Sequence, residues 1–282
     1  MKYLDVHESG PTFFGLANGP IVATVIDQHP DCVDYVEIAF EQLRHHPPTA
    51  LLQEQIPVVL HCSSMSVAGF SAPTEATLSA IDGHAQRTRT PWIGEHLAYI
   101  AALPLDDEAG TAELTELTYT VCPQLSEETV ERVALNLDRL RSRFSVPIIL
   151  ENSPQYYPVP GSTMSMPAFV AEVAASCDVD LLLDLTHFLI TTANMGLDPL
   201  PSLHQLPLER VVEVHLSGMS KQSGHWWDDH SVPASEEVFE LLSSARDRVN
   251  PRAVTFEYNW APSMPESVVL SQIQRAREIL IG

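Results

Sequence analysis

Imidazole and carboxylate side chains recur at the ends of short apolar runs that lie far apart in the chain. These residues are His61, Glu95, His96, Glu151, Asp184, His215 and Glu257, and a further acid, Glu37, lies inside such a run. If they meet in one pocket, their charges need compensation, because an unpaired buried ion costs on the order of several kcal/mol. Imidazole and carboxylate ligands without thiolates suit iron, manganese or zinc, and the number of groups indicates more than one metal ion.

Two local patterns add groups of the same kind. Asp184 is followed three residues later by His187, and Asp228 is followed two residues later by His230. Each pair offers a carboxylate and an imidazole within one turn of chain. Either pattern alone occurs by chance in many proteins, but together with the residues at the ends of the apolar runs they predict one shared site.

The remaining histidines and Cys62 are interpreted as structural. We expect six histidines at the surface, because they lack an acidic or histidine partner at ligand spacing. They are His7, His29, His45, His46, His84 and His204. His225, beside Trp226 and Trp227, either shapes a lid over the pocket or is an ordinary loop residue. Cys62 directly follows His61, and successive side chains of a strand point to opposite faces, so Cys62 should pack away from the site.

The elements that position these residues follow from the alternation of β-branched or aliphatic runs with segments of helical spacing. The predicted strands are 12–16, 35–39, 58–62, 92–97, 148–152, 181–184, 211–216 and 253–258. The clearest helix starts after Ser126, a good N-cap residue followed by acids and by apolar residues three or four apart. Further helices are predicted at 74–89, 167–176, 235–248 and 265–280.

The apolar runs are continuous rather than alternating, which is typical of parallel strands covered on both faces. Eight such strands alternating with helices predict an α/β fold, a single TIM-type (β/α)₈ barrel forming one domain over residues 1–282. In this fold the active site lies at the C-terminal ends of the strands, where the histidines and acids fall. The acidic stretch 104–124 is predicted to be an extended loop after the fourth strand.

Net charge and the distribution of cysteines indicate which partners and which cellular compartment to expect. Lys and Arg number 15 against 37 Asp and Glu, a net charge of −22, which disfavours binding to nucleic acid or to anionic membranes. The four cysteines are scattered without a CxxC pair, and the first residues lack the pattern of a signal peptide. No apolar run approaches the roughly 20 residues that span a bilayer. We therefore expect a soluble protein of the cytoplasm.

With these residues in view, the chain resembles the multinuclear non-heme iron-dependent oxidases, a family of peptide-tailoring enzymes that includes the methanobactin-biosynthesis oxidase. The matching segments are VVLHCSSMSVAG (58–69), GEHLAYI (94–100), ILENSPQYY (149–157), LLLDLTHFLITTANMG (181–196), VHLSGM (214–219), DDH (228–230) and FEYN (256–259). The resemblance covers most of the chain, and the ordered series is specific although each piece alone is not. It implies a TIM barrel related in layout to endonuclease IV and the xylose isomerase-like barrels.

Carried over by position, the resemblance implies three metal sites. The first consists of His61, His96 and Glu151. The second consists of Glu151 as a bridge with Asp184, His215 and Glu257. The third consists of His187, Asp228 and His230. The cofactor implied is iron, as two or three ions, with O₂ as co-substrate. The catalytic residues implied are Glu151, Asp184, His187, Asp228 and His230. Many members have Asn where this chain has His187, and the His favours a filled third site.

Members of this family oxidise residues, commonly Cys, in ribosomally made peptides, and often work with a separate protein that presents the peptide. The resemblance therefore implies a precursor peptide as substrate and a peptide-presenting partner protein. Three alternatives remain: a zinc-dependent phosphodiesterase like endonuclease IV, a manganese-dependent sugar isomerase or epimerase, and a metal-binding partner without turnover. A DNA-binding barrel needs cations around its pocket, and the site loops supply few beyond Lys221. Among these candidates, only the oxidase would consume O₂ while changing the mass of a Cys-containing peptide.

Overall fold

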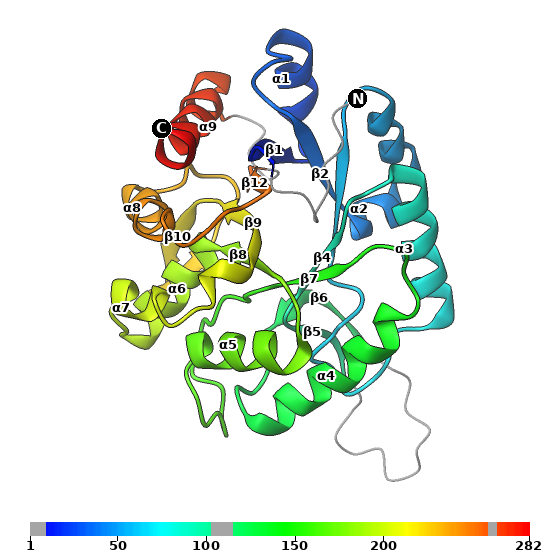
Figure 1. Cartoon of the computed structure of the whole chain (residues 1–282), viewed down its shortest axis with the longest axis vertical. Helices are drawn as coiled ribbons and strands as arrows, with labels where there is room; N and C mark the ends of the chain where they lie inside the picture. Colours follow the sequence, from blue (N-terminus) through cyan, green and yellow to red (C-terminus); the bar gives the residue numbers. More distant parts are fainter. Residues whose placement is uncertain (1–9, 103–114, 259–263) are drawn as a thin grey trace.

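A closed barrel of eight parallel strands forms the centre of the protein, as the sequence predicts (Figure 1). The computed structural model describes residues 10–102, 115–258 and 264–282. The barrel strands, in chain order, are β1 (Phe13–Ala17), β2 (Tyr35–Ala39), β3 (Val58–Cys62), β4 (Ile93–His96), β7 (Ile148–Glu151), β8 (Leu181–Asp184), β9 (Val211–Leu216) and β12 (Ala253–Phe256). Neighbours in sequence are neighbours in the barrel, and β1 closes it against β12.

Helices follow the strands and surround the barrel (Figure 1). They are α1 (Val22–Gln28), α2 (Phe40–His45), α3 (Glu75–Thr88), α4 (Glu127–Arg141), α5 (Met166–Cys177), α6 (Leu185–Met195), α7 (Pro199–Leu203), α8 (Glu236–Ala245) and α9 (Glu266–Ile281), with short 3₁₀ turns at Pro47–Glu54 and Leu208–Arg210. Helix α4 starts as predicted, because the Ser126 hydroxyl accepts the Thr129 N–H. Its apolar side, including Val133 and Leu137, is buried against the barrel layer.

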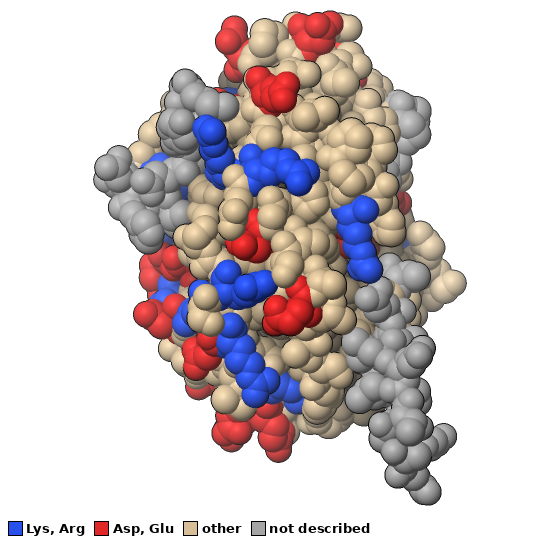
Figure 2. All heavy atoms as spheres, turned by 90° about the vertical axis from the view of Figure 1, so that its right-hand side faces the viewer, with Lys and Arg blue, Asp and Glu red and all other residues tan. Residues whose placement is uncertain are grey.

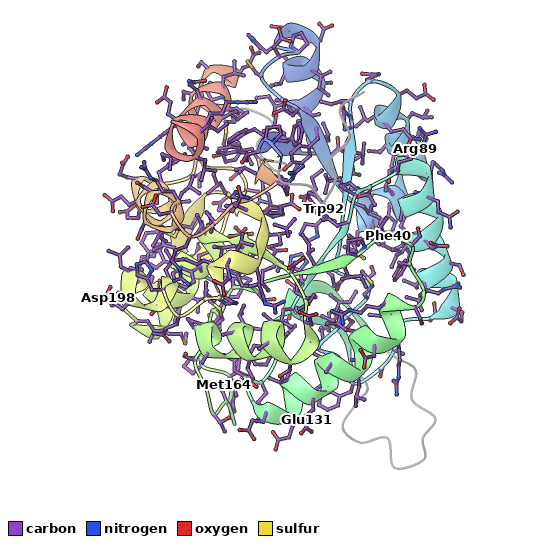
Figure 3. The ribbon with its side chains drawn as sticks, viewed as in Figure 1. Phe40, Arg89, Trp92, Glu131, Met164 and Asp198 are labelled. Atoms are coloured by element: carbon purple, nitrogen blue, oxygen red, sulfur yellow. The ribbon has the colours of Figure 1, made fainter. Side chains whose placement is uncertain are left out.

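The interior of the barrel is filled by side chains at alternate strand positions, below the end that carries the site. Tyr35 and Trp92 belong to this inner cluster, and Trp92 lies near the centre of the molecule while Glu131 and Asp198 lie at its edge (Figure 3). Gly15 makes room for the Tyr35 ring, since a Cβ at residue 15 would lie 2.5 Å from it. The barrel interior is thus a packed core rather than a pore.

Within the described residues, two hairpins extend from the barrel that the sequence patterns do not predict. Strand β5 (Tyr99–Ala102) pairs antiparallel with β6 (Thr115–Val121), so 115–121 is a strand rather than part of an extended loop. Of the rest of the predicted loop, residues 104–114 lie outside the described residues, and residues 122–124 form no helix or strand. Strand β10 (Met219–Gln222) pairs with β11 (His225–Asp228) through Ser223 and Gly224, both at positive φ. Two such residues are what a tight hairpin turn requires.

The outer surface carries both signs of charge despite the net charge of −22. On the face drawn in Figure 2, Lys and Arg side chains are interspersed with acidic ones. Within the described ranges, we find no helix with the length and apolar character that crossing a membrane demands.

Candidate metal centre

Strand alternation turns seven of the predicted side chains into the mouth of the barrel. Glu37, His61, His96, Glu151, Asp184, His215 and Glu257 have the same parity as the inner cluster along their strands. All are buried except His96, which is partly exposed. Because the strands are parallel and the barrel is closed, their C-terminal ends meet at one opening.

Glu151 lies at the centre of this cluster. Its Oε2 is 2.8 Å from His61 Nε2 and 3.3 Å from His96 Nε2, and its Oε1 is 3.0 Å from His187 Nδ1. The rings of His61 and His96 are stacked with centroids 4.7 Å apart. One carboxylate therefore faces imidazoles on both of its oxygens, which is the arrangement a bridging ligand needs.

A second group consists of Asp184, His215 and Glu257. His215 Nδ1 lies 3.3 Å from Glu257 Oε2 and 4.0 Å from Glu151 Oε1. In the part of the chain that the structure describes, Asp184 Oδ2 and His215 Nδ1 are buried and lack a hydrogen-bond partner. Buried polar atoms are normally satisfied, so two such atoms in one acidic pocket fit a bound cation.

The third group lies between helix α6 and strand β11. His230 Nε2 is 2.7 Å from Asp228 Oδ2, and His187 Nε2 is 3.5 Å from the same oxygen. The Asp184 side chain accepts the His187 N–H at 2.5 Å, so the residue that ends β8 also caps α6. This cap fixes the first helical turn and brings the His187 ring over the barrel mouth.

The donor set fits metal binding in each of these groups. The possible ligand atoms of His61, His96 and Glu151 all lie within 4.8 Å of one another, and the same holds for Asp184, His215 and Glu257 and for His187, Asp228 and His230. Nitrogen and oxygen donors without thiolates are those of iron, manganese and zinc sites. The structure thus brings together every predicted ligand, while binding of metal by them stays a prediction.

Burial and contacts between the side chains shift the pKa values of these groups, and the direction differs from one group to another. Burial raises the pKa of Asp184 to about 7. For Glu151, burial opposes ionisation, but His96 and His61 hold its pKa well below the usual range. For His61, burial favours the neutral ring, yet Glu37 and Glu151 raise its pKa to about 10. Without metal, some of these ligand groups are therefore protonated at neutral pH, and binding of a cation would release those protons.

Contacts around the cluster orient its members. Asn152 donates from Nδ2 to the Asp184 carbonyl and accepts the Asp184 N–H at Oδ1, both at 2.9 Å. The Asn152 carbonyl lies 3.1 Å from His187 Nδ1, so it can accept the proton on that nitrogen and leave Nε2 facing Asp228. The Ser217 hydroxyl donates to Asp228 Oδ1 at 3.1 Å. Outer contacts of this kind fix ring orientation and tautomer in metal sites.

A pocket of about 520 Å³ opens over the cluster. Tyr156 and Trp227 form one wall, with their rings stacked at 4.4 Å between centroids. The hairpin β10–β11 carries Trp227, and Asn194 holds this hairpin by bonding both the N–H and the carbonyl of Trp226. His225 lies outside the pocket lining and contacts Tyr157, with ring centroids 4.6 Å apart.

Two sequence expectations are corrected, one acid lacks a predicted role, and one acid is absent from the prediction. Glu95 points away from the mouth, because it alternates with His96, and it accepts the N–H groups of Met65 and Ser66. His84 is buried rather than exposed. Glu37 was noticed but not included among the ligands, and Glu213 was missed altogether. The sequence signal for both was their place within otherwise apolar strands, where a charged residue needs a partner.

Cys62 and the remaining histidines, which the sequence analysis interprets as structural, can be compared with their positions in the structure. Cys62 is buried in the cluster between barrel and helices, although it also borders the pocket. His29 is partly exposed and contacts Glu266. His45, His46 and His204 are exposed, as expected. His7 lies outside the described residues.

The chain matches the sequence model of a family described as "RiPP precursor modification enzyme MbnB/TglH/ChrH" over residues 14–280. A RiPP is a ribosomally synthesised and post-translationally modified peptide. Since the match covers nearly the whole chain, the protein belongs to this family, and the resemblance seen in the sequence is confirmed. The comparison supports an enzyme that acts on a peptide precursor.

Similar sequences from bacteria match the same chain. A UPF0276 protein of Caulobacter vibrioides is 27% identical over 271 residues, covering 94% of this chain and 93% of its own. A UPF0276 protein of Streptomyces avermitilis is 26% identical over 247 residues, which are 86% of this chain but 50% of its own, so the present chain spans half of that relative.

Solved structures confirm the TIM-type barrel. D-Psicose 3-epimerase from Clostridium cellulolyticum has a TM-score of 0.57 at 12% identity, with 96% of this chain and 98% of the epimerase covered. Endonuclease IV from Thermus thermophilus has a TM-score of 0.54 at 16% identity, with 95% of this chain and 99% of the endonuclease covered. At such identities the likeness concerns the fold alone.

Proposed function

We propose that this protein is an iron- and O₂-dependent oxidase that modifies a residue, most directly a Cys, of a ribosomally synthesised precursor peptide. The observation that carries the proposal is the cluster around Glu151, which faces His61, His96 and His187 and adjoins two further ligand groups in one pocket. The family supplies the substrate class, since its members are described as modifying peptide precursors.

Iron bound at neighbouring groups would supply a binding point for a substrate thiolate and for O₂, and the means to pass electrons between them. The chain's own residues perform the positioning. Glu151 lies between the groups, and Asp184 is held by Asn152 through paired backbone bonds. Holding two reactants on adjacent sites lowers the entropic part of the barrier.

The pocket is suited to a peptide side chain. Its volume of about 520 Å³ accommodates one residue with its neighbours, and the stacked Tyr156 and Trp227 rings offer an apolar wall beside the ligand cluster. These rings would exclude water from the reacting residue. A separate protein that presents the peptide remains part of the proposal, because the pocket admits only a short part of a precursor.

The alternative of phosphodiester hydrolysis is disfavoured by the charge of the pocket. Among the described residues that line it there is no Lys or Arg, whereas Glu37, Glu41, Asp228 and Glu257 are present. A phosphate backbone needs cations along its path. The basic side chains seen in Figure 2 lie on an outer face instead. Sugar isomerisation is favoured by fold likeness alone.

The test is anaerobic loading of the protein with Fe(II), followed by incubation with a Cys-containing precursor peptide with and without O₂. We expect O₂ consumption and a change in peptide mass that require both iron and O₂. The matched control is the same peptide with Cys replaced by Ala, which should stay unmodified. Turnover with zinc in place of iron, or without O₂, would contradict the proposal.

A further inference from the structure

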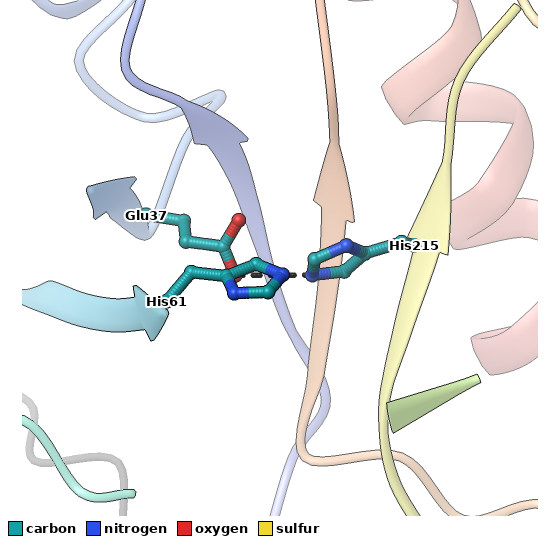
Figure 4. Close-up of side chains that lie close together, drawn as sticks. All are labelled: Glu37, His61 and His215. Carbon is teal, nitrogen blue, oxygen red and sulfur yellow. Dashed lines mark hydrogen bonds and ion pairs between the residues drawn. The ribbon is translucent and has the colours of Figure 1, made fainter. Parts of the chain in front are cut away.

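His215 presents its two ring nitrogens to two different surroundings. Nδ1 faces the metal group, 3.3 Å from Glu257 Oε2. Nε2 faces the opposite way, 3.0 Å from Glu37 Oε2 and 3.5 Å from Glu213 Oε1 (Figure 4 shows the Glu37 contact). The ring is fully buried, so bulk water does not reach either set of contacts.

Glu213 is held in place by donors from three other strand segments. Trp92 Nε1–H and the Thr255 hydroxyl each donate to it at 2.7 Å, and the Tyr35 hydroxyl lies 3.4 Å away. All four side chains have no exposed surface. Glu213 is thus a fixed acceptor in the barrel interior, directly below the mouth.

The position of these acids decides which nitrogen of His215 carries the proton. Nε2 is hydrogen-bonded to Glu37 at 3.0 Å, whereas Nδ1 has no hydrogen-bond partner among the described residues. A carboxylate accepts, so Nε2, between Glu37 and Glu213, is the donor. In a neutral imidazole the other nitrogen then has the free lone pair. That nitrogen is Nδ1, which lies in the group with Asp184 and Glu257.

We propose that Glu37, supported by Glu213, is a positioning residue that holds His215 with Nε2 protonated and Nδ1 directed at the metal. This inference rests on the proposed function only in assuming that the mouth binds metal, and it does not depend on oxidase chemistry. Outer carboxylates of this kind also raise the basicity of the ligating ring.

The same three residues, Glu37, His61 and His215, could instead form a metal group of their own, since their ligand atoms lie within 4.8 Å of one another. The geometry argues against this. His215 Nε2 lies 3.0 Å from Glu37 and 3.5 Å from Glu213, so in the proposed arrangement it carries a proton, and His61 Nε2 lies 2.8 Å from Glu151 in the first group. One nitrogen lone pair binds one ion, so neither nitrogen is left for Glu37.

The experiment compares metal content and metal affinity of the full chain in three forms: wild type, Glu37→Gln and Glu37→Ala. Affinity is measured by chelator competition, and the iron environments are recorded by ⁵⁷Fe Mössbauer spectroscopy. The Ala variant should bind one metal about 10- to 100-fold more weakly, with a changed signal from one iron. The Gln variant, whose amide oxygen still accepts the Nε2 proton, should lose clearly less affinity.

Asp34→Asn is the matched control. Asp34 lies on the same approach to β2, three residues before Glu37, and accepts the Phe14 N–H and Arg277 at 3.0 Å, away from the site. Its loss should lower thermal stability and leave metal affinity unchanged. If the Ala variant does not fold, Glu37→Leu fills the same space without an acceptor and takes its place.

Each outcome decides a separate point. Wild-type affinity in both Glu37→Ala and Glu37→Leu overturns the inference and leaves the proposed function standing. Equal loss of one whole metal equivalent in the Gln and Ala variants makes Glu37 a ligand and also overturns it. A wild-type protein that binds no metal defeats the proposed function together with the inference. Metal binding with the expected ranking but no O₂ consumption defeats only the oxidase.

Discussion

Glu151 Oε2 lies 2.8 Å from His61 Nε2, although 90 positions separate the two residues in the chain. The barrel produces this contact: β3 pairs with β4 and β4 with β7, so that His61 and Glu151 end strands two places apart. The same closure brings His215 and Glu257 to the opposite side of Glu151. The candidate metal centre is therefore a consequence of topology, and its ligands depend on one another.

Replacing Glu151 should remove metal from more than one group at once. In Glu151→Gln the shared carboxylate charge is lost, so we expect more than one metal equivalent to be missing and peptide modification to be abolished. Metal content by elemental analysis is the measurement.

The control for this variant is Glu95→Gln. Glu95 is equally buried, but it faces away from the mouth, and burial keeps its pKa well above the usual range. A neutral amide should replace a protonated carboxyl with little change in metal content. Equal metal loss in both variants would show a general effect of buried acids rather than ligation.

Metal affinity should rise with pH. Burial raises the pKa of Asp184 to about 7, and contacts with Glu37 and Glu151 outweigh burial to raise that of His61 to about 10, so a metal ion must displace protons at neutral pH. Chelator competition between about pH 6 and pH 8 should show tighter binding at the higher value, with proton release detectable in weakly buffered solution. Affinity that does not change over this range would contradict the account.

The metal-free protein should respond to pH in the opposite sense. The native pKa of Asp184 exceeds its ordinary value of 3.8, so the folded state holds more protons than the unfolded state between about pH 4 and pH 7. Its contribution to stability is present at the low end and is lost as the pH rises through about 7. Thermal melts with and without chelator should therefore diverge as the pH rises.

The hairpin β10–β11 should control the third metal group. Asn194→Ala removes two bonds to the Trp226 backbone and leaves partly buried backbone groups without these partners, at a cost of about 1 kcal/mol or more. Asp228 ends this hairpin, so metal at His187, Asp228 and His230 should be lost first, while the groups around Glu151 are kept. Mössbauer spectra can separate these populations.

Asn136→Ala is the control for Asn194→Ala, because it removes a similar pair of side-chain bonds to the backbone away from the hairpin. Asn136 also clamps two backbone carbonyls, those of Val67 and Gly69, neither of which lines the pocket. We expect a similar loss of stability with all metal groups occupied. If this variant also loses only the third metal, the prediction that the β10–β11 hairpin controls that metal group is contradicted.

Gly15→Ala should destabilise the fold. A Cβ at this residue would lie 2.5 Å from the Tyr35 ring, and overpacking of this kind costs about 1–3 kcal/mol. Gly83→Ala, within α3, meets no atom within 4 Å and should be neutral or stabilising by up to about 1 kcal/mol. Denaturant unfolding measures both changes, and a Gly15→Ala protein as stable as wild type would contradict the described barrel interior.

The strands could be predicted because both faces of each are buried, which gives continuous apolar runs such as 181–184 and 211–216. The residue pair Asp184 and His187 could be predicted to act together because their spacing is local. The hairpins could not, since the side chains that the structure describes in β5, β6, β10 and β11 are partly or fully exposed.

The roles of the acids within strands could not be predicted from sequence patterns. The sequence predicts Glu95 at the mouth because Glu95, like His96, lies at the end of an apolar run, but the twofold alternation of a strand allows only one of two adjacent side chains to point inward. The role of Glu37 depends on the stagger between strands. It pairs in register with Val59, two residues below His61, and so reaches His215 across the barrel. That stagger is a property of the closed sheet and has no local signal.

The most direct test of the metal cluster is elemental analysis of protein purified without added metal or chelator, combined with a peptide assay on the same sample. We predict two or three iron ions per chain, O₂-dependent modification of a Cys-containing precursor, and loss of both in Glu151→Gln. Protein that is free of metal and cannot be loaded with iron, or that retains its full iron content without Glu151, would contradict the account.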